Sequence, residues 1–353
     1  MGGPAQTAPA HLSAVATAVP EYALHQSDVV ARATEIFAPD VADFDRYTPV
    51  YANAGVATRY SCVPLEWYGQ PHSFTERNDL YIENSVTLLE RVAGDLLGQA
   101  GLMANDIDAL VVVSTTGMAT PSLDALLIER MALRRDVERL PVFGLGCAGG
   151  VTGLARAGQL AKSKPGARVM LLVVELCGLT FQANDTAKSN IISTALFGDG
   201  AAGAILQCAG EGLAIIDWAE HTWPDSLDVM GWSFGEDGLG IQLSRDVPGF
   251  VRNNLSGPAG AFLERNGLTL ANIDRHICHP GGGKVLDALE EVLGLEQGEL
   301  VASRAVMRDY GNMSAATALF VLKETMAQSP TGRYLMSALG PGFTASFALL
   351  EAG

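Results

Sequence analysis

Residues 140–162 read LPVFGLGCAGGVTGLARAGQLAK, and the organisation of the whole chain can be worked out from them. A short apolar run, typical of a strand, leads into a glycine-rich turn that holds Cys147, and an alanine-rich helix follows. Glycines permit the sharp strand-to-helix turn that side chains would obstruct. Cys147 is therefore expected in the first turn of the helix, where the partial positive charge of the helix N-terminus favours the thiolate.

Two other interpretations of this stretch stay open on local grounds. A lone cysteine in an apolar segment is more often packing than chemistry, because free cysteine is among the most buried residue types. In addition, Gly144, Gly146 and Gly149 form a GxGxxG pattern between a strand and a helix, and the next apolar run ends on Glu175. This is nearly the fingerprint of a dinucleotide-binding domain. The rest of the chain has to decide between these interpretations.

Length, composition and charge limit the possible classes. The 353 residues fit two domains or one large duplicated domain, and 48% hydrophobic residues suffice for a buried core. A net charge of −16 argues against nucleic acid and anionic membranes as partners, since both require a concentrated positive field. The five cysteines are scattered and predict neither a disulfide framework nor a metal site, and we expect no cofactor. We expect a cytoplasmic protein without a signal peptide or a membrane span.

Strands and helices alternate along the chain, which predicts an α/β fold. The second half repeats the first: residues 101–108 recur as residues 267–274, and residues 168–171 recur as residues 333–336. Two similar halves are expected to direct equivalent turns toward one shared site. We divide the chain into a disordered tail at residues 1–11, a first half at residues 12–210 and a second half at residues 211–353.

The second half supplies two candidate partners for Cys147. Asn312 occupies the place that Cys147 has in the first half, on a glycine turn before a helix, and His279 follows the expected strand at 276–278. The carboxyl end of a strand is a usual place for catalytic groups in α/β sheets. Each residue alone has an ordinary explanation, as a helix cap or a loop residue. A dinucleotide-binding domain predicts no such partner for Asn312, so the duplication favours a catalytic site.

Several motifs resemble those of the chalcone synthase-like type III polyketide synthases. They are GLGCAGG around Cys147, ALFGDGAA at 195–202, DVPG at 246–249, HPGGGKVLD at 279–287, YGNMSAA at 310–316 and GPGFT at 340–344. The similarity extends in order over residues 12–350, and HPGG stands where ketoacyl synthase III enzymes have HxAN. The resemblance implies the duplicated thiolase-like fold with αβαβα layers, a homodimer, and a catalytic triad of Cys147, His279 and Asn312.

The activity that the resemblance implies is a decarboxylative condensation. Cys147 attacks a starter acyl-CoA, coenzyme A leaves, and malonyl-CoA is decarboxylated beside the acylated cysteine. A thiolate paired with a histidine is nucleophilic near neutral pH, and a histidine and an amide can both donate to the thioester oxygen as negative charge grows there. The second enzyme candidate is a ketoacyl synthase III-like enzyme, which needs a basic docking patch for an acyl carrier protein that this acidic chain does not show.

The resemblance also assigns positions for the substrates. Phe197 matches the gatekeeping phenylalanine between the coenzyme A tunnel and the cavity, and the other expected cavity residues are Cys177, Thr180, Thr115, Ile241, Ser314 and Glu175. The basic residues that hold coenzyme A phosphates in plant members are missing from residues 47–58, which leaves Arg46, Arg59 and Lys284 as candidates. Since the expected cavity has few rings, we expect an aliphatic starter and an alkylpyrone or alkylresorcinol product. An aromatic starter and malonyl-CoA alone are the alternatives.

Overall fold

The computed structural model describes residues 8–164, 166–208, 212–235, 237–244 and 246–353. Its centre is a mixed sheet of nine strands in the order β11-β12-β13-β8-β1-β7-β6-β4-β5. The first half of the chain supplies β1 (Ala10–Ala18), β4 (Ala109–Val113), β5 (Glu138–Val142), β6 (Val169–Leu176) and β7 (Asp199–Gln207). The second half supplies β8 (Leu213–Thr222), β11 (Arg275–Cys278), β12 (Gly332–Gly340) and β13 (Thr344–Ala352).

The strand order shows the duplication that the sequence predicts. In the first half, β4 pairs in parallel with β5 and β6, and β7 and β1 follow in antiparallel pairs. In the second half, β11 pairs in parallel with β12, and β13 and β8 follow in antiparallel pairs. The second half therefore repeats the first, without a counterpart of β5 in the part of the chain described. The two halves join where β1 pairs with β8.

The repeated sequence motif has the same structural role in each half. Asp108 Oδ2 accepts a hydrogen bond from the backbone N–H of Arg168 at 2.9 Å, and Asp274 Oδ2 accepts one from the N–H of Arg333 at 2.7 Å. Each aspartate also donates its own N–H to the carbonyl of the same arginine, at 2.9 Å. Each aspartate thus fixes the start of its strand, β4 or β11, against the neighbouring strand, β6 or β12.

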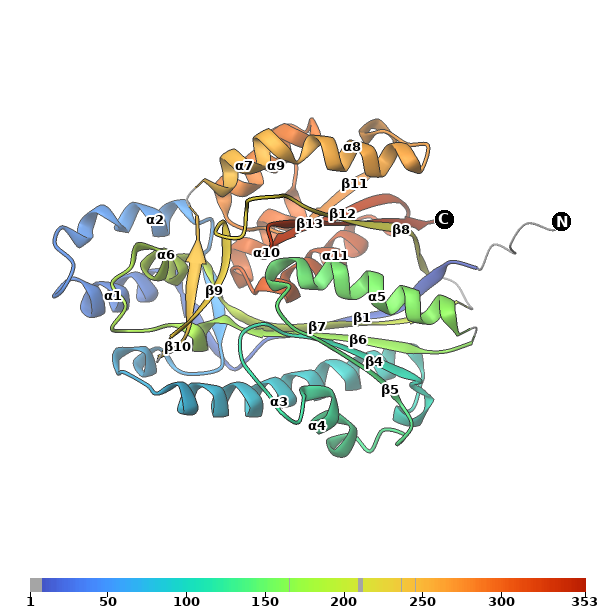
Figure 1. Ribbon diagram of the computed structural model, residues 1–353, viewed down its shortest axis with the longest axis horizontal. Helices are drawn as coiled ribbons and strands as arrows, with labels where there is room; N and C mark the ends of the chain where they lie inside the picture. Colours follow the sequence, from blue (N-terminus) through green and yellow to red (C-terminus); the bar gives the residue numbers. More distant parts are fainter. Residues whose placement is uncertain (1–7, 165, 209–211, 236, 245) are drawn as a thin grey trace.

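The helices form three layers around the two halves of the sheet (Figure 1). The outer face of the first half is covered by α3 (Phe74–Ala100) and α4 (Leu123–Arg130). The outer face of the second half is covered by α7 (Val247–Asn254), α8 (Ser256–Arg265) and α9 (Gly283–Leu293). Between the halves lie α5 (Gly149–Ser163) and α11 (Thr317–Gln328), with α10 (Val301–Tyr310) beside α11. This is the αβαβα layering of the thiolase-like fold.

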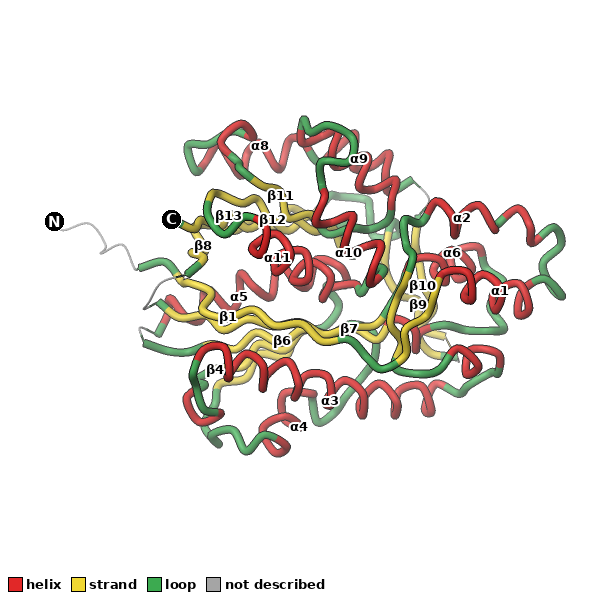
Figure 2. Tube along the Cα trace, turned by 180° about the vertical axis from the view of Figure 1, so that it is seen from behind, coloured by secondary structure: helices red, strands yellow, loops and turns green. Residues whose placement is uncertain are grey.

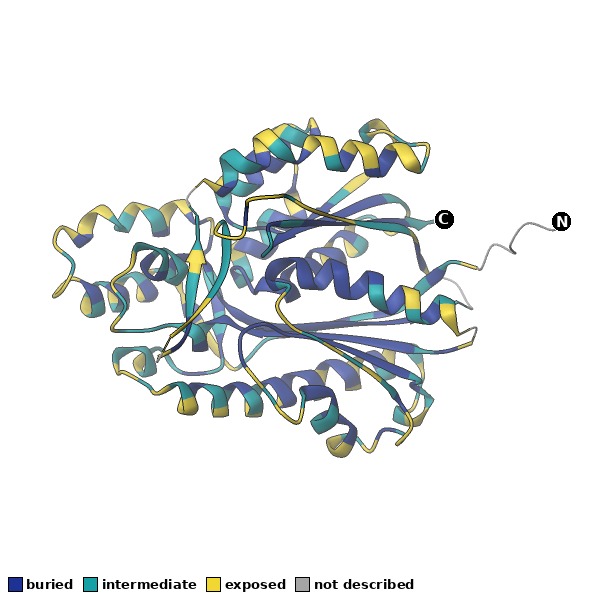
Figure 3. Ribbon diagram, viewed as in Figure 1, coloured by how far each residue is buried: buried dark blue, intermediate teal, exposed yellow. Residues whose placement is uncertain are grey.

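The central helix α5 is the most deeply buried of these elements (Figure 3). Val151 and Leu154 of α5 share one apolar core with Leu319 and Leu322 of α11 and with strands of both halves. Burial of this apolar surface favours the closed, layered arrangement by about 25 cal/mol for each Å² removed from water. The turn that precedes α5 is therefore held between the two halves.

A smaller part of the chain packs at one end of the layers, at the left in Figure 1 and the right in Figure 2. It comprises α1 (Gln26–Phe37), α2 (Thr48–Asn53), α6 (Lys188–Leu196), and the two-stranded sheets of β2 (Tyr22–His25) with β3 (Thr58–Ser61) and β9 (Met230–Gly235) with β10 (Gly238–Leu243). These helices have a core of their own around Phe37, Tyr51 and Ile191. Among the described residues, no helix has the length and apolar character needed to cross a membrane.

The expected tail at residues 1–11 is too long. β1 begins at Ala10, whose side chain is fully buried and which pairs with Ile215 of β8. The strand starts there because the two halves join through these first residues. Residues 1–7, and the expected boundary between residues 210 and 211, lie outside the described residues.

Candidate active site

Cys147 lies in a single 3₁₀ turn, Gly146–Ala148, directly before α5. Its side chain is 6% exposed, and Sγ donates a weak hydrogen bond to Ser314 Oγ over 3.7 Å. Gly146 has φ 47°, a conformation that suits glycine, and a Cβ there would lie 2.7 Å from Pro341 Cδ. The glycines of this turn let the second half of the chain approach the cysteine closely.

The dinucleotide-binding interpretation of this turn is wrong. A Cβ at Gly150 would lie 2.2 Å from the carbonyl oxygen of Ala315, so the chain's own second half fills the space beside the turn. The preceding strand, β5, lies at the edge of the sheet and not at a central switch point. Glu175, the acidic residue of the apparent fingerprint, is fully buried and accepts hydrogen bonds from Thr115 N–H at 3.0 Å and the Thr116 hydroxyl at 2.9 Å.

His279 follows β11 directly, as the sequence predicts. Its backbone N–H donates to the carbonyl of Ser337 at 2.8 Å, which fixes the residue at the end of the strand. The side chain is 5% exposed, and neither ring nitrogen has a hydrogen-bond partner in the structure. Leaving buried polar atoms unpaired is costly, so such atoms in a cavity wall indicate a role with a ligand.

Asn312 lies in the turn between α10 and α11. Gly311 before it has φ 70°, and Ser314 after it has φ 45°, which is unusual for a residue with a side chain. Asn312 Oδ1 accepts the N–H of Ser314 at 2.8 Å. Because the side-chain oxygen is bound in this way, Nδ2 is left as the donor that the amide offers to a ligand.

The structure brings the three residues of the predicted triad together. Cys147, His279 and Asn312 line one cavity of about 380 Å³, although they come from different elements and from both halves of the chain. Further residues predicted for this site also line the cavity: Phe197, Cys177, Ile241, Ser314 and Lys284.

Three residues predicted for the cavity do not line it. Thr115 is buried behind the catalytic turn, where its hydroxyl accepts the N–H of Gly146 at 3.2 Å. Thr180 lines a separate small pocket beside Arg77. Glu175 lies behind Thr115 in the interior, and burial raises its pKa to about 7. Glu175 lies near the end of β6 and Thr115 just beyond β4, where a shift of one residue along the chain reverses the side-chain direction, and Thr180 lies in the 3₁₀ turn that follows β6.

One of the predicted coenzyme A contacts is corrected. Arg46 is exposed, forms an ion pair with Asp43 and lies outside the cavity wall, so its contact with coenzyme A stays a prediction. Arg59 is buried, and its guanidinium donates to backbone carbonyls, so it is not available to a phosphate at the cavity mouth. Lys284 is exposed and lines the cavity, together with Lys188, which the sequence reasoning did not find.

Comparisons with known proteins agree with this site. The N-terminal domain of chalcone and stilbene synthases matches residues 4–210, and the C-terminal domain of the same family matches residues 216–351. The chain belongs to this family. It is a type III polyketide synthase.

The relatives cover nearly the whole synthase. A 1,3,6,8-tetrahydroxynaphthalene synthase of Streptomyces peucetius subsp. caesius is 38% identical, over 96% of this chain and 92% of its own. A putative chalcone synthase of Bacillus subtilis (strain 168) is 36% identical, over 97% and 98% of the two chains. The crystal structure of the 1,3,6,8-tetrahydroxynaphthalene synthase of Streptomyces coelicolor A3(2) superposes with a TM-score of 0.92 at 27% identity, over 97% and 99%. The synthase is thus a transferase of the condensing type, and the family decides against a ketoacyl synthase III.

The hairpin of β9 and β10 supplies cavity residues that sequence reasoning missed. Trp232 of β9 lies opposite Ile241 of β10, and both line the cavity. The wall therefore contains a second aromatic side chain besides Phe197. The signal that could have found Trp232 is the alternation of residues 230–243, because the cross-strand partner of Ile241 has to share its face. The cavity lining is otherwise mainly aliphatic, with Ile192, Leu196, Met230, Leu243, Val247 and Leu339.

Burial acts in opposite directions on the two titratable groups of the synthase's site. Desolvation raises the pKa of the Cys147 thiol to about 12, against the lowering effect of hydrogen bonds with Ser314 and Asn312. Desolvation also lowers the pKa of His279 to about 3. Neither a thiolate nor an imidazolium is stable here alone. Transfer of the thiol proton to His279, as the resemblance implies, would create both charges together and leave the net charge of the site unchanged, and we expect the nucleophile to form by this route once substrate is bound.

We therefore expect the substitution His279→Ala to shift the alkylation of Cys147 by iodoacetamide to higher pH. Without the proton acceptor, burial alone governs the thiol, and the midpoint of the rate profile should rise by about one pH unit or more. Residue-specific alkylation is measured by peptide mass between pH 5 and pH 10, and a rate that reaches its plateau in the wild type but still rises at pH 10 in His279→Ala counts as the expected shift. His276→Ala is a matched control, since His276 is a partly buried histidine of β11 whose pKa burial lowers to about 4 but which lies outside the cavity. An unchanged midpoint in His279→Ala would contradict the proton transfer.

Proposed function

We propose that the synthase loads an aliphatic acyl group from coenzyme A onto Cys147 and extends it with malonyl-CoA to an alkylpyrone or alkylresorcinol type of product. The observation that supports the catalytic part is the shared cavity of Cys147, His279 and Asn312, with both ring nitrogens of His279 free for substrate. No resident cofactor takes part in this proposal. The chemistry comes from the coenzyme A thioesters and the three side chains.

The proposed steps use each group of the triad for what its environment allows. The Cys147 sulfur attacks the thioester carbonyl of the starter, and its proton passes to His279. Coenzyme A then leaves as the free thiol after it takes this proton from His279. Malonyl-CoA then loses carbon dioxide, and the electron pair moves into the thioester, whose oxygen becomes negative. The His279 ring and the Asn312 amide can both donate to that oxygen. The resulting carbanion attacks the acyl group on Cys147, which releases the sulfur and forms the new carbon–carbon bond.

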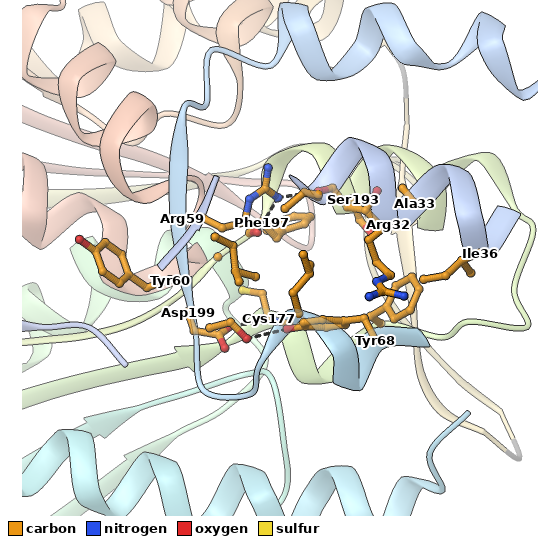
Figure 4. Close-up of a pocket in the computed structure, with 18 of the residues that line it drawn as sticks. Arg32, Ala33, Ile36, Arg59, Tyr60, Tyr68, Cys177, Ser193, Phe197 and Asp199 are labelled. Carbon is orange, nitrogen blue, oxygen red and sulfur yellow. Dashed lines mark hydrogen bonds between the residues drawn. The ribbon is translucent and has the colours of Figure 1, made fainter. Parts of the chain in front are cut away.

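A second chamber next to the cavity supports the aliphatic starter. It has a volume of about 80 Å³, and Cys177 and Phe197 belong to the walls of both spaces (Figure 4). Its lining is mainly apolar, with Leu24, Val29, Ile36, Phe37, Leu65 and Phe181. The end of a flexible chain fits there and gains about 0.8 kcal/mol for each buried methylene.

A second candidate function is favoured by the relatives. Two of the proteins to which the synthase is similar are named as 1,3,6,8-tetrahydroxynaphthalene synthases. The product in that name carries no alkyl or phenyl substituent and has hydroxyl groups at alternating positions, which is the pattern expected of a chain built from malonyl-CoA alone. The mainly aliphatic cavity of about 380 Å³ also has room for such a growing chain. The two candidates share the triad and differ in what first occupies Cys147.

Product analysis separates the two candidates. The synthase is incubated with malonyl-CoA alone and with malonyl-CoA plus each of a series of acyl-CoAs from acetyl to palmitoyl, together with one phenylpropanoid-CoA. Release of coenzyme A and the masses of the products are recorded. Products that contain an aliphatic chain, formed faster than any product of malonyl-CoA alone, support the proposal. A preference for malonyl-CoA alone, or for the phenylpropanoid starter, would overturn the aliphatic assignment.

We expect Cys177→Phe to shift the synthase toward shorter starters. Cys177 lines both spaces, so a phenyl ring there would occupy part of the volume in which we propose that a long starter chain lies. Competition between short and long acyl-CoAs, read from the product masses, measures the change. Cys177→Ala is the matched control and should keep or extend the preference for long chains. If Cys177→Phe kept the wild-type chain-length preference, the second chamber would not hold the starter.

The remaining parts of the proposal concern coenzyme A and the assembly. Lys188 and Lys284 line the cavity and are the positive groups that we propose to meet the coenzyme A phosphates. A homodimer fits the free edge of β5, because an unpaired strand edge favours pairing and Phe143 just beyond it is 53% exposed. A reducing cytoplasm is the proposed setting, since the thiol of Cys147 has to stay free, and all five cysteines are free in the structure.

A further inference from the structure

Arg59 is a buried cation that holds the end of α6. Arg59 belongs to β3, and it is 4% exposed. Nη1 donates to the carbonyl oxygens of Thr194 at 2.5 Å and Phe197 at 3.0 Å, and Nη2 donates to that of Ala195 at 3.0 Å. Carbonyl groups at the end of a helix have no partner within the helix, so the guanidinium satisfies three of them at once. Figure 4 shows Arg59 next to Phe197 in the wall of the second chamber.

The guanidinium group of Arg59 is itself held in place by a second side chain. Nη2 also donates to Gln26 Oε1, while Gln26 Nε2 donates to the carbonyls of Tyr51 at 3.0 Å and Ala195 at 3.1 Å. Burial lowers the pKa of Arg59 to about 10, so the side chain is still charged at neutral pH. Hydrogen bonds from a charged donor are stronger than neutral ones, and the negative end of the helix dipole adds to them. The end of α6 is thus fixed by a rigid, charged donor.

The segment that Arg59 holds is bonded to the backbone of Asn312. The N–H of Asn312 donates to the carbonyl of Leu196 at 2.8 Å, and the N–H of Gly198 donates to the carbonyl of Asn312 at 3.0 Å. Phe197 and Asn312 therefore form an isolated parallel bridge between the two halves of the site. Each of the two residues lines the catalytic cavity.

This bridge is packed directly against the stem of Arg59. A Cβ at Gly198 would lie 2.6 Å from the carbonyl oxygen of Tyr310 and 3.1 Å from Arg59 Cβ. A Cβ at Gly311 would lie 2.9 Å from the carbonyl oxygen of Leu196 and 3.4 Å from Arg59 Cβ. The two backbones approach as closely as glycine allows, and Arg59 covers the place where they meet.

We propose that Arg59 is a positioning residue for the decarboxylation step. It touches no substrate in the cavity, but it fixes the end of α6 and, through the two backbone hydrogen bonds, the place of Asn312 relative to Cys147 and His279. The same contacts hold Phe197 between the cavity and the second chamber. The proposal rests on the proposed function, because that chemistry gives Asn312 a negative oxygen to stabilise. A donor displaced by about 1 Å can lose about a hundredfold in rate.

The test compares two half-reactions of the Arg59→Met variant. Methionine keeps much of the stem but removes the donors. We expect kcat for the decarboxylation of malonyl-CoA to fall about tenfold to a hundredfold with little change in KM. The rate at which an acyl-CoA acylates Cys147 is measured by intact mass in a single turnover. This rate should stay within about threefold of the wild-type rate, since Cys147 and His279 control it. A general loss of structure would lower both rates by the same factor.

Arg77→Met is the matched control for this test. Arg77 is also 4% exposed and donates to backbone carbonyls, those of Phe181 and Asp237, but it lies outside the catalytic cavity and does not contact the end of α6. It should leave the ratio of the two half-reactions unchanged. Arg59→Lys should recover part of the decarboxylation rate, because an ammonium group can donate to some of the same carbonyls. If Arg59→Met does not fold, the same comparison is made with Arg59→Lys and Gln26→Ala. In these variants we expect a smaller loss of decarboxylation, again with acylation little changed.

The outcomes separate this inference from the proposed function. A wild-type synthase that neither acylates Cys147 nor decarboxylates malonyl-CoA would remove the proposed function, and the inference with it. A wild type that performs both reactions, together with Arg59 variants that lose the two rates equally or not at all, would leave the function intact and refute the positioning role. If Arg77→Met lost decarboxylation relative to acylation by as much as Arg59→Met, the positioning role would also be refuted.

Discussion

The substitution Cys147→Ala is expected to abolish loading of the starter and all condensation. Cys147 is the thiol on the turn between the halves, and it shares its cavity with His279 and Asn312. Without a sulfur nucleophile there is no acyl-enzyme, so the extension has no electrophile. Some decarboxylation of malonyl-CoA should persist, because His279 and Asn312 keep their donors for the thioester oxygen. Intact mass after exposure to an acyl-CoA, with and without malonyl-CoA, measures both effects.

A matched control for this variant is Cys208→Ala. Cys208 is also a free cysteine, half-buried beyond the end of β7, and it does not line the cavity. This variant should acquire the acyl group at the wild-type rate. A stable acyl adduct on Cys62, Cys177, Cys208 or Cys278 in the Cys147→Ala protein would show that the nucleophile has been assigned to the wrong thiol.

The substitution Asn312→Ala is expected to slow the decarboxylation of malonyl-CoA by about a hundredfold to a thousandfold, or about 3 to 4 kcal/mol. The amide oxygen is bound to the N–H of Ser314, so the group that alanine removes is the Nδ2 donor. Acylation of Cys147 should fall much less, since the thiol and His279 control it. Steady-state release of carbon dioxide and single-turnover acylation distinguish the two effects.

Asn312→Asp separates the loss of a donor from a change of shape. Aspartate has nearly the size of asparagine, but its carboxylate accepts hydrogen bonds and would repel the negative oxygen of the enolate. We expect it to be at least as poor as alanine in decarboxylation. If Asn312→Ala decarboxylated malonyl-CoA at the wild-type rate, the donor role of Asn312 would have to be given up.

The fold followed from patterns that can be read in the sequence, and the candidate triad followed from the repeat together with the family resemblance. The apolar run that ends at Ser114 became the buried strand β4, and the spacing of residues 101–108 and 267–274 became two copies of one aspartate turn. A repeat of spacing predicts a repeat of strand order, since each copy has to bury the same faces. Cys147, His279 and Asn312 all stand at the ends of strands or the starts of helices, where such turns converge.

The residues of the cavity wall were predicted less well, for a different reason. Thr115 and Thr180 were placed in the wall by resemblance, yet one lies behind the catalytic turn and the other in a separate pocket. Trp232 and Lys188 were missed, although Ile241 of the same hairpin and Phe197 after the same helix were predicted, because the resemblance assigned only single positions and the neighbours of those positions appear only in the folded structure. The direction of a side chain at a strand end depends on a register of one residue, which sequence patterns do not fix there.

The sequence by itself predicted the duplicated α/β fold through its repeat, and it placed Cys147, His279 and Asn312 on equivalent turns, while their catalytic roles are what the resemblance implies. Only the tertiary structure decided which side chains line the cavity and what Arg59 contacts. In the sequence Arg59 is one more basic residue and a candidate for coenzyme A. In the structure it is closed off from solvent and its donors meet the carbonyls at the end of α6. Burial and hydrogen-bond partners arise from contacts between distant segments, so they exist only once the chain has folded.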